Sequence, residues 1–125
     1  FINLINNSIE AIQRDAGKKE KAPEARSGRW IRVITKQIGA TAFVEFCDGG
    51  PGFTPDGLKH AFDTFHRASS PVGMGIGLSI CLQIIQAIGG TIRVQNGPVG
   101  GACFTIELPC AHKATPPDST GAGQL

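Results

Sequence analysis

The chain has 125 residues, of which 41% are apolar, and this size and composition suit one domain built around a single hydrophobic core. Its 12 basic and 10 acidic residues give a formal net charge of +2, which is too balanced to predict nucleic-acid or membrane binding from charge alone. No apolar run approaches the roughly 20 residues that a membrane-spanning helix needs, and no stretch has the pattern of a secretory leader.

The first predicted element is an amphipathic helix over residues 1–15, which ends before Gly17. One face carries the isoleucines Ile2, Ile5, Ile9 and Ile12. Another face carries the polar residues Asn3, Asn7, Glu10 and Arg14. Because Phe1 already lies inside this helical pattern and is not a start methionine, we expect the chain to be a piece of a longer protein. Residues 15–29 lack periodicity and contain charges, proline and glycine, which predicts a solvated loop.

Two β-rich runs follow, "RWIRVITKQ" and "ATAFVEFCD", and the short "IGA" between them predicts an antiparallel hairpin. The stretch "GGPGF" ends the second strand. Next, "TPDGLKHAFDTF" begins with capping residues and predicts a short helix, whereas "HRASSPV" is polar and irregular. A glycine run then opens a helix from Leu78 to about Ile88, which Gly89 and Gly90 terminate.

The last two predicted strands are "GTIRVQN" and "GACFTIELP", joined through "GPVGG". Helices that are segregated from mostly antiparallel strands predict an α+β fold, a two-layer sandwich with a mixed, mostly antiparallel sheet packed on helices. Residues 1–109 are expected to form this domain, and the polar, proline-bearing residues 110–125 are expected to form a disordered tail.

The four cysteines lack the two-residue spacing that zinc and redox sites favour. We expect them to be reduced thiols, and three of them lie in apolar runs, which suits core positions in a cytoplasmic protein. They are Cys47, Cys81, Cys103 and Cys110.

Three local patterns suggest a nucleotide site. The stretch "PVGMGIGLSI" places Gly73, Gly75 and Gly77 before a helix, and it fits neither the dinucleotide fingerprint nor the glycine-lysine-serine/threonine loop. A helix start of this kind favours phosphate through its free N–H groups and the positive end of its dipole. In "CDGGPGF", Asp48 can accept a hydrogen bond from the amino group of adenine, although an aspartate in a tight turn is the plainer interpretation.

The third pattern is the pair of asparagines Asn3 and Asn7, whose spacing puts both amides on one helix face. Amide oxygens suit a hard cation, and magnesium usually takes one or two protein oxygens together with ligand phosphates. Solvated asparagines on a helix surface are the alternative.

Together these stretches closely resemble the ATP-binding domain of sensor histidine kinases, in the superfamily shared with gyrase, the heat-shock chaperone and mismatch-repair ATPases. The resemblance covers residues 1 to about 109. "NLINNSIEA" is similar to the asparagine box, "DGGPGF" to the first glycine box, "FDTF" to the phenylalanine box and "GMGIGL" to the second glycine box. The four motifs occur in the family's order, which makes the resemblance specific.

The resemblance implies a Bergerat-type fold that binds ATP and Mg²⁺ under a lid at roughly residues 66–72. It places Asn7 at the magnesium position, Asn3 at the earlier asparagine and Asp48 at adenine. The full set of implied nucleotide-binding residues is Asn3, Asn7, Asp48, Gly50, Gly52, Phe65, Arg67, Gly73, Met74, Gly75, Ile76, Gly77, Leu78 and Thr105. No residue of this chain is assigned a catalytic role.

Several positions depart from the family's pattern. Glu10 stands where many members carry a basic residue, so Arg67 or Arg14 would have to contact phosphate instead. Thr64 stands where a proline is common. Thr105 is expected to hydrogen-bond near Asp48 through water, as an equivalent threonine does in related ATPases.

The resemblance implies the catalytic half of a histidine kinase, which presents the γ-phosphate of Mg-ATP to a histidine on a separate dimerisation domain of the parent protein. The parent would then pass the phosphate to a response regulator. We expect a cytoplasmic, monomeric fragment that binds no nucleic acid, from a parent whose membrane status is open. None of His60, His66 and His112 lies in a stretch like the family's acceptor box.

Three alternatives use the same motifs. A hydrolase of the gyrase or chaperone branch would carry a glutamate one helical turn before the magnesium asparagine, where this chain has Asn3. Without such a base, hydrolysis loses about 10² to 10⁴-fold, which favours the kinase. A serine kinase of the anti-sigma type and a non-catalytic ATP-binding module are the other two.

Overall fold

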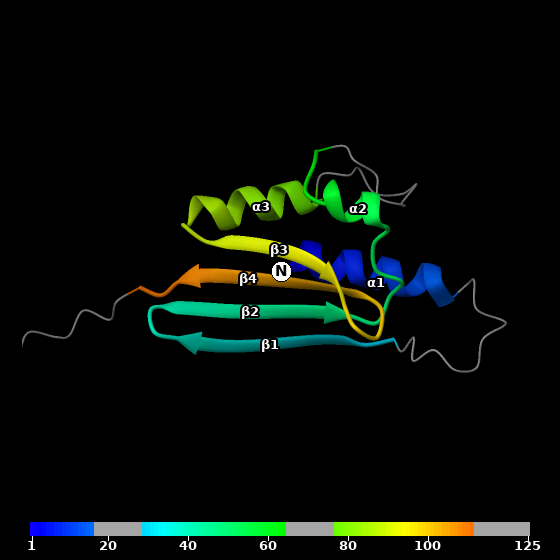
Figure 1. Ribbon diagram of the computed structural model, residues 1–125, viewed down its shortest axis with the longest axis horizontal. Coiled ribbons are helices and arrows are strands. Elements are labelled where there is room, and N and C mark those ends of the chain that lie inside the picture. Colours follow the sequence, from blue (N-terminus) through cyan, green and yellow to red (C-terminus); the bar gives the residue numbers. More distant parts are fainter. Residues whose placement is uncertain (17–28, 65–76, 112–125) are drawn as a thin grey trace, which may run out of the picture.

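The computed structural model describes residues 1–16, 29–64 and 77–111, and these form a helix layer packed on one antiparallel sheet (Figure 1). Each element lies close to where the sequence predicts it. In chain order they are α1 (Ile2–Ala16), β1 (Ile31–Ile38), β2 (Thr41–Asp48), α2 (Pro55–Lys59), α3 (Gly77–Ala87), β3 (Thr91–Asn96) and β4 (Ala102–Pro109).

The four strands lie side by side in the order β1-β2-β4-β3, and each neighbouring pair is antiparallel. The α+β sandwich predicted from the sequence is therefore confirmed. Since β4 lies between β2 and β3, the sheet brings the end of β2 next to the start of β4. Asp48 ends β2 and Ala102 begins β4, so these two residues lie close together at one end of the sheet.

The core lies between the helices and one face of the sheet. Alternate residues of the strands point to the same face, and this face carries the buried side chains of β2, β3 and β4. Leu4 of α1 joins them, and apolar side chains of α3 pack against the cluster. Its buried members are Leu4, Val44, Phe46, Ile92, Ala102, Phe104 and Ile106.

The orientation of α1 differs from what an amphipathic helix normally shows. Its isoleucines point largely to solvent, with Ile2, Ile5 and Ile9 exposed by 74%, 38% and 41%. The inward face instead carries Leu4 and Ser8, which are 2% and 1% exposed. The helix thus turns a partly polar face toward the sheet, and this face includes residues of the candidate site.

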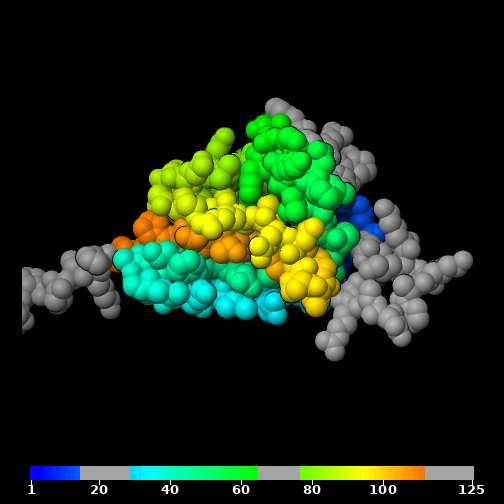
Figure 2. All heavy atoms as spheres, viewed as in Figure 1, coloured from blue at the N-terminus to red at the C-terminus, as the bar shows by residue number. Residues whose placement is uncertain are grey.

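The strand β1 is an edge strand, and all eight of its residues are exposed. In the space-filling view the cyan atoms of β1 form one border of the molecule, away from the green atoms of α2 and α3 (Figure 2). Among the described residues, no helix is long and apolar enough to cross a membrane.

The structure contradicts the expectation of four reduced cysteines. Cys47 of β2 and Cys103 of β4 are direct partners in the sheet register and form a disulfide. Cys81 and Cys110 are free and half-buried. Because 56 residues separate the bonded pair along the chain, their spacing does not indicate the pairing, which the strand register creates.

Candidate functional site

Asp48 is the buried centre of the site, with an exposed fraction of 3%. Its Oδ1 accepts hydrogen bonds from the backbone N–H of Gly50 at 2.9 Å and of Ala102 at 3.2 Å. Its Oδ2 accepts one from the Ser8 hydroxyl at 2.8 Å. A carboxylate offers about four acceptor sites. These three donors from the described residues therefore leave capacity on Oδ2 for one further donor.

Asp48 consequently joins three elements that are distant in sequence. The bond from Gly50 is the local type that closes an aspartate turn. The bonds from Ser8 and Ala102 reach it from α1 and from the start of β4. The plain turn interpretation therefore holds for Asp48, and the same carboxylate also ties α1 to the start of β4.

The loop after Asp48 is tied to the end of β3. Gly52 has a positive φ of 74°, and a Cβ added there would lie 2.6 Å from Asn96 Oδ1. The Asn96 side-chain amide makes two hydrogen bonds with Phe53, the residue after Gly52. Phe53 N–H donates to Asn96 Oδ1, and Asn96 Nδ2 donates to Phe53 O, each at 2.8 Å. Only glycine fits this close approach at position 52, so the loop beside Asp48 has a fixed path.

The two predicted asparagines of α1 lie beside the start of α3. Asn3 Nδ2 donates to Gly77 O at 3.5 Å. A Cβ added at Gly77 would lie 3.9 Å from both amide atoms of Asn7. Asn3 and Asn7 are both half-buried. Helix α1 therefore brings the asparagine pair to the end of α3 where the first N–H groups of a helix lack intrahelical partners.

Adjacent residues of α1 connect the surroundings of Asp48 with the start of α3. Ser8 contacts the Asp48 carboxylate, and its neighbour Asn7 faces Gly77. Leu78 follows Gly77 and packs partly buried against the core, which holds the start of α3 in place. The structure thus brings Asp48, Gly50 and Gly77 next to α1, which carries Asn3 and Asn7. Gly52 lies against Asn96 and Gly101, and Leu78 packs against the core.

Six predicted residues lie outside the described part of the chain, as does the predicted lid over residues 66–72. They are Phe65, Arg67, Gly73, Met74, Gly75 and Ile76. Of the two arginines considered for phosphate contact, Arg14 is described and exposed on α1.

The expectation for Thr105 is corrected by the strand register. Thr105 pairs with Glu45, and its neighbours Phe104 and Ile106 belong to the core beneath the helices. Because side chains alternate along a strand, Thr105 points to the opposite face, away from the Asp48 carboxylate. The group of β4 that contacts this carboxylate is the backbone N–H of Ala102.

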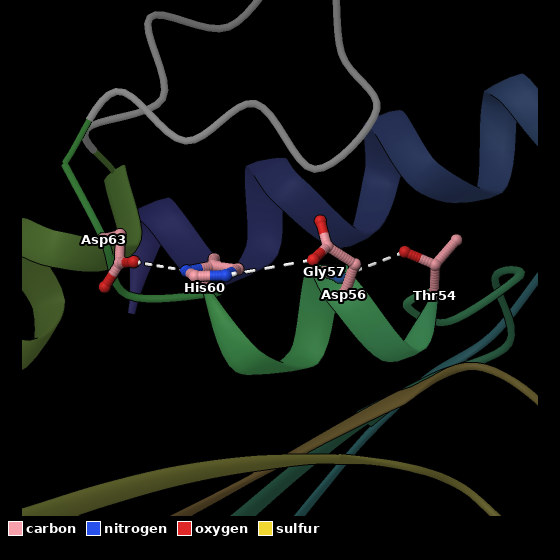
Figure 3. Close-up of polar contacts among 5 residues, drawn as sticks. All are labelled: Thr54, Asp56, Gly57, His60 and Asp63. Carbon is pink, nitrogen blue, oxygen red and sulfur yellow. Dashed lines mark hydrogen bonds and ion pairs between the residues drawn. The ribbon is translucent and has the colours of Figure 1, made fainter.

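A separate polar cluster caps α2 (Figure 3). Thr54 Oγ1 accepts from Gly57 N–H at 3.0 Å, which is an N-cap contact. His60 Nδ1 lies 2.7 Å from Asp63 Oδ2, and its Nε2 lies 3.8 Å from Asp56 Oδ1. This cluster fixes both ends of the short predicted helix, and its histidine is held by two carboxylates of its own segment.

The sequence reasoning missed three contributors to the site. Ser8 follows Asn7 directly within "NLINNSIEA", and this place inside the motif was the available signal. Asn96 ends β3 next to Gly97, a position that usually marks a turn. Gly101 has a φ of 80°, and a Cβ there would overlap the main-chain carbonyl of Asp48. Its signal was the double glycine before the last strand.

The chain is similar to known proteins along most of its length. Residues 1–112 match the family model described as histidine kinase-, DNA gyrase B-, and HSP90-like ATPase. The signal transduction histidine-protein kinase AfsQ2 of Streptomyces coelicolor is 38% identical over 98 residues, which cover 75% of this chain and 18% of that protein. The sensor protein KdpD of Escherichia coli is 42% identical over 112 residues, which cover 87% of this chain and 11% of that protein. The chain thus spans less than a fifth of the length of these relatives.

Solved structures show the same fold. The catalytic domain of histidine kinase ThkA superposes with a TM-score of 0.65 and 28% identity, over 86% of this chain and 62% of that one. With the family model matched over residues 1–112, the chain belongs to the histidine kinase-, DNA gyrase B- and HSP90-like ATPases, and its relatives and structural neighbours are sensor histidine kinases.

Proposed function

We propose that this chain binds Mg-ATP and, within its parent protein, donates the γ-phosphate to a histidine on a separate dimerisation domain. The observation that carries the proposal is the pair of neighbouring contacts made by α1. Ser8 holds the Asp48 carboxylate, and Asn7 lies beside Gly77 at the start of α3. Helix α1 thereby sets the distance between Asp48, the proposed acceptor for adenine, and the start of α3, the proposed phosphate-binding end.

In this proposal Asp48 reads the base. The unused acceptor capacity of its Oδ2 takes a hydrogen bond from the adenine amino group. Guanine carries a carbonyl at that position, so it would face the carboxylate with a second acceptor. Gly50 and Gly52 give the loop beside Asp48 its path, because a Cβ at Gly50 would crowd Asp48 Oδ1 and Ala11 and one at Gly52 would overlap Asn96.

Asn7 and the start of α3 hold the metal and the phosphates in this proposal. Among the described residues, no group of three or more His, Cys, Asp or Glu is placed to hold a metal ion. Mg²⁺ would therefore rely on the Asn7 amide oxygen, the phosphates and water, a donor set that magnesium commonly accepts. The N–H groups of Gly77 and Leu78 belong to the first turn of α3, where intrahelical partners are lacking, and such groups favour phosphate. The metal, when bound, neutralises charge on the transferring phosphoryl group.

The remaining predicted residues complete this proposal. Phe65, Arg67 and the glycine stretch 73–76 would close over the triphosphate, and Arg67 or Arg14 would supply its cation. Residues 1–109 form the ATP-binding domain, acting in the cytoplasm as a monomer that binds no nucleic acid. A response regulator would receive the phosphate through the parent, in keeping with relatives that are named signal transduction kinases.

A hydrolase of the same superfamily is the second candidate. It needs a base to activate water one helical turn before Asn7, and Asn3 occupies that position with its amide donating to Gly77 O. An amide cannot take a proton from water at neutral pH, which favours phosphoryl transfer over hydrolysis.

The parent protein labelled with γ-³²P-ATP tests the proposal. We expect phosphate that is labile in acid and stable in base, as a phosphorus–nitrogen bond on histidine requires. Acid-stable label would indicate a serine kinase. Release of free phosphate without labelled protein would indicate a hydrolase, and bound ATP without either product would indicate a non-catalytic module.

A further inference from the structure

We propose that Cys47 and Cys103 form a reversible thiol–disulfide site that controls nucleotide affinity through Asp48, an inference that rests on the proposed ATP binding. The two residues are direct cross-strand partners of β2 and β4, with their Cα atoms 4.1 Å apart and their sulfurs bonded. None of the four family motifs of the chain includes either cysteine.

The disulfide lies next to the contacts that hold the adenine acceptor. Cys47 directly precedes Asp48 on β2. Cys103 directly follows Ala102, whose N–H donates to Asp48 Oδ1 at 3.2 Å. Gly101 packs against the main-chain carbonyl of Asp48. The bond therefore cross-links the two strands at the residues adjoining this contact, and breaking it frees the strand ends to separate.

The sulfurs lie on the sheet face opposite the helices. Cys47 and Cys103 alternate with Phe46 and Phe104, which point to the helices, so both sulfurs point to the other face. Among the described residues no helix covers that face. The flanking side chain of Glu45 is exposed. Both cysteines are themselves buried, at 1% and 9%, so a reagent reaches their sulfurs only when the neighbouring groups move.

The cross-link also closes a long loop that contains much of the candidate site. The chain between the two cysteines includes α2, α3 and β3, and thus Gly77 as well as the loop at Gly52. A cross-link across such a loop removes conformational freedom from less ordered states. Ligand binding then costs less ordering in the oxidised chain than in the reduced one. We expect at least about a fivefold tighter Kd on oxidation, the low end of ordinary coupling between sites.

The chemistry needs an oxidant, which a low-molecular-weight disulfide such as glutathione disulfide supplies. One cysteine thiolate attacks it, forms a mixed disulfide and releases one glutathione thiolate. The second cysteine attacks the mixed disulfide and releases the other. In total the protein loses two thiol protons and two electrons, one protein S–S bond forms, and the oxidant's S–S bond becomes two thiols.

The test compares the 125-residue chain in its oxidised and reduced forms. Alkylation and mass spectrometry count the free thiols in glutathione buffers of set ratio, and calorimetry measures the Kd for a non-hydrolysable ATP analogue with Mg²⁺. We expect two of the four thiols to be protected in the oxidised form, together with the tighter Kd. The double variant Cys47→Ala/Cys103→Ala should bind the analogue with the same Kd in oxidising and reducing buffer. If the double variant does not fold, the single variant Cys103→Ser is used in its place. Cys81→Ala/Cys110→Ala, the matched control, should keep the full redox response, and Cys110→Ala alone serves if it does not fold.

Distinct outcomes separate this inference from the proposed function. Equal Kd values in both forms, or no disulfide at any glutathione ratio, would overturn the switch and leave ATP binding intact. A redox response that survives in the Cys47→Ala/Cys103→Ala variant would assign it to other cysteines and overturn the switch too. Loss of the circular dichroism signal on reduction would make the disulfide a structural cross-link only. Absence of nucleotide binding in both forms would overturn the proposed function and the switch together.

Discussion

Ser8 donates its hydroxyl to Asp48 Oδ2 at 2.8 Å, although 40 residues separate the two along the chain. Both side chains are buried, at 1% and 3%. A buried bond to a charged acceptor is worth more than a neutral one, typically about 1.5–3 kcal/mol. It fixes the rotation of α1 about its axis, and this rotation decides that Asn7 faces Gly77.

Asp48→Asn should weaken ATP binding while the fold survives. The amide oxygen of the variant side chain can still accept from Gly50 and Ala102, and the Ser8 hydroxyl can turn to accept from the new amide. The amide would then present a donor to the adenine amino group, and an unpaired buried donor costs about 1–3 kcal/mol, or roughly 5- to 150-fold in Kd. Calorimetry with ATP measures this loss. GTP binding should not fall in parallel, and an unchanged ATP affinity would remove Asp48 from the base site.

Ser8→Ala should act on stability more than on base preference. The variant removes a buried donor and leaves Asp48 Oδ2 without its protein partner, so we expect the free energy of unfolding to fall by about 1–3 kcal/mol. Urea denaturation followed by circular dichroism measures it. Ile9→Ala on the exposed face of the same helix is the control, and it should change the free energy by less than about 0.5 kcal/mol. Equal losses in the two variants would contradict a special role for the Ser8–Asp48 bond.

Asn7→Ala should damage Mg-ATP binding more than metal-free ATP binding, because the amide oxygen is proposed to bind magnesium. Titrations with Mg²⁺ and with EDTA give the two Kd values. Asn6→Ala is a matched control, since Asn6 is the exposed neighbour on the same helix and makes no described contact with α3. An equal loss with and without metal would make Asn7 a structural residue of the helix.

The sequence predicted the elements of the fold well, because each strand and helix has its own local pattern. It did not predict which face of α1 is covered. The isoleucine stripe indicates a helix, but the inward face is decided by the Ser8–Asp48 bond and by the asparagines at Gly77, and both partners are remote in sequence.

The strand register explains the other two errors. A shift of one residue exchanges the two faces of a strand, so no pattern within "GACFTIELP" places Thr105 relative to Asp48. The same register opposes Cys47 and Cys103. By contrast, the glycines and Asp48 could be proposed from the sequence because their motifs are local and their spacing is short.

Gly101→Ala should destabilise the chain more than Gly39→Ala. Both glycines have positive φ, at 80° and 57°, so both variants suffer the backbone strain of about 1–2 kcal/mol that a side chain causes there. Gly39 has nothing within 4 Å of an added Cβ, whereas at Gly101 the Cβ overlaps the Asp48 carbonyl. The difference between the two unfolding free energies isolates this contact. Equal losses would show that the end of β4 can move away from Asp48 without cost.

The 125-residue chain alone should bind ATP but neither label itself nor turn ATP over at a useful rate. Phosphoryl transfer depends on placing a nucleophile in line with the γ-phosphate. The described His60 lies at the end of the short helix α2, where Asp63 and Asp56 hold it. Asn3, in turn, cannot act as the base for water. Incubation with γ-³²P-ATP tests both points, and adding the histidine-bearing domain of the parent in trans should restore label on that domain. Stable label on this chain, or hydrolysis near the roughly 1 s⁻¹ low end of enzyme turnover, would favour the serine-kinase or hydrolase function instead.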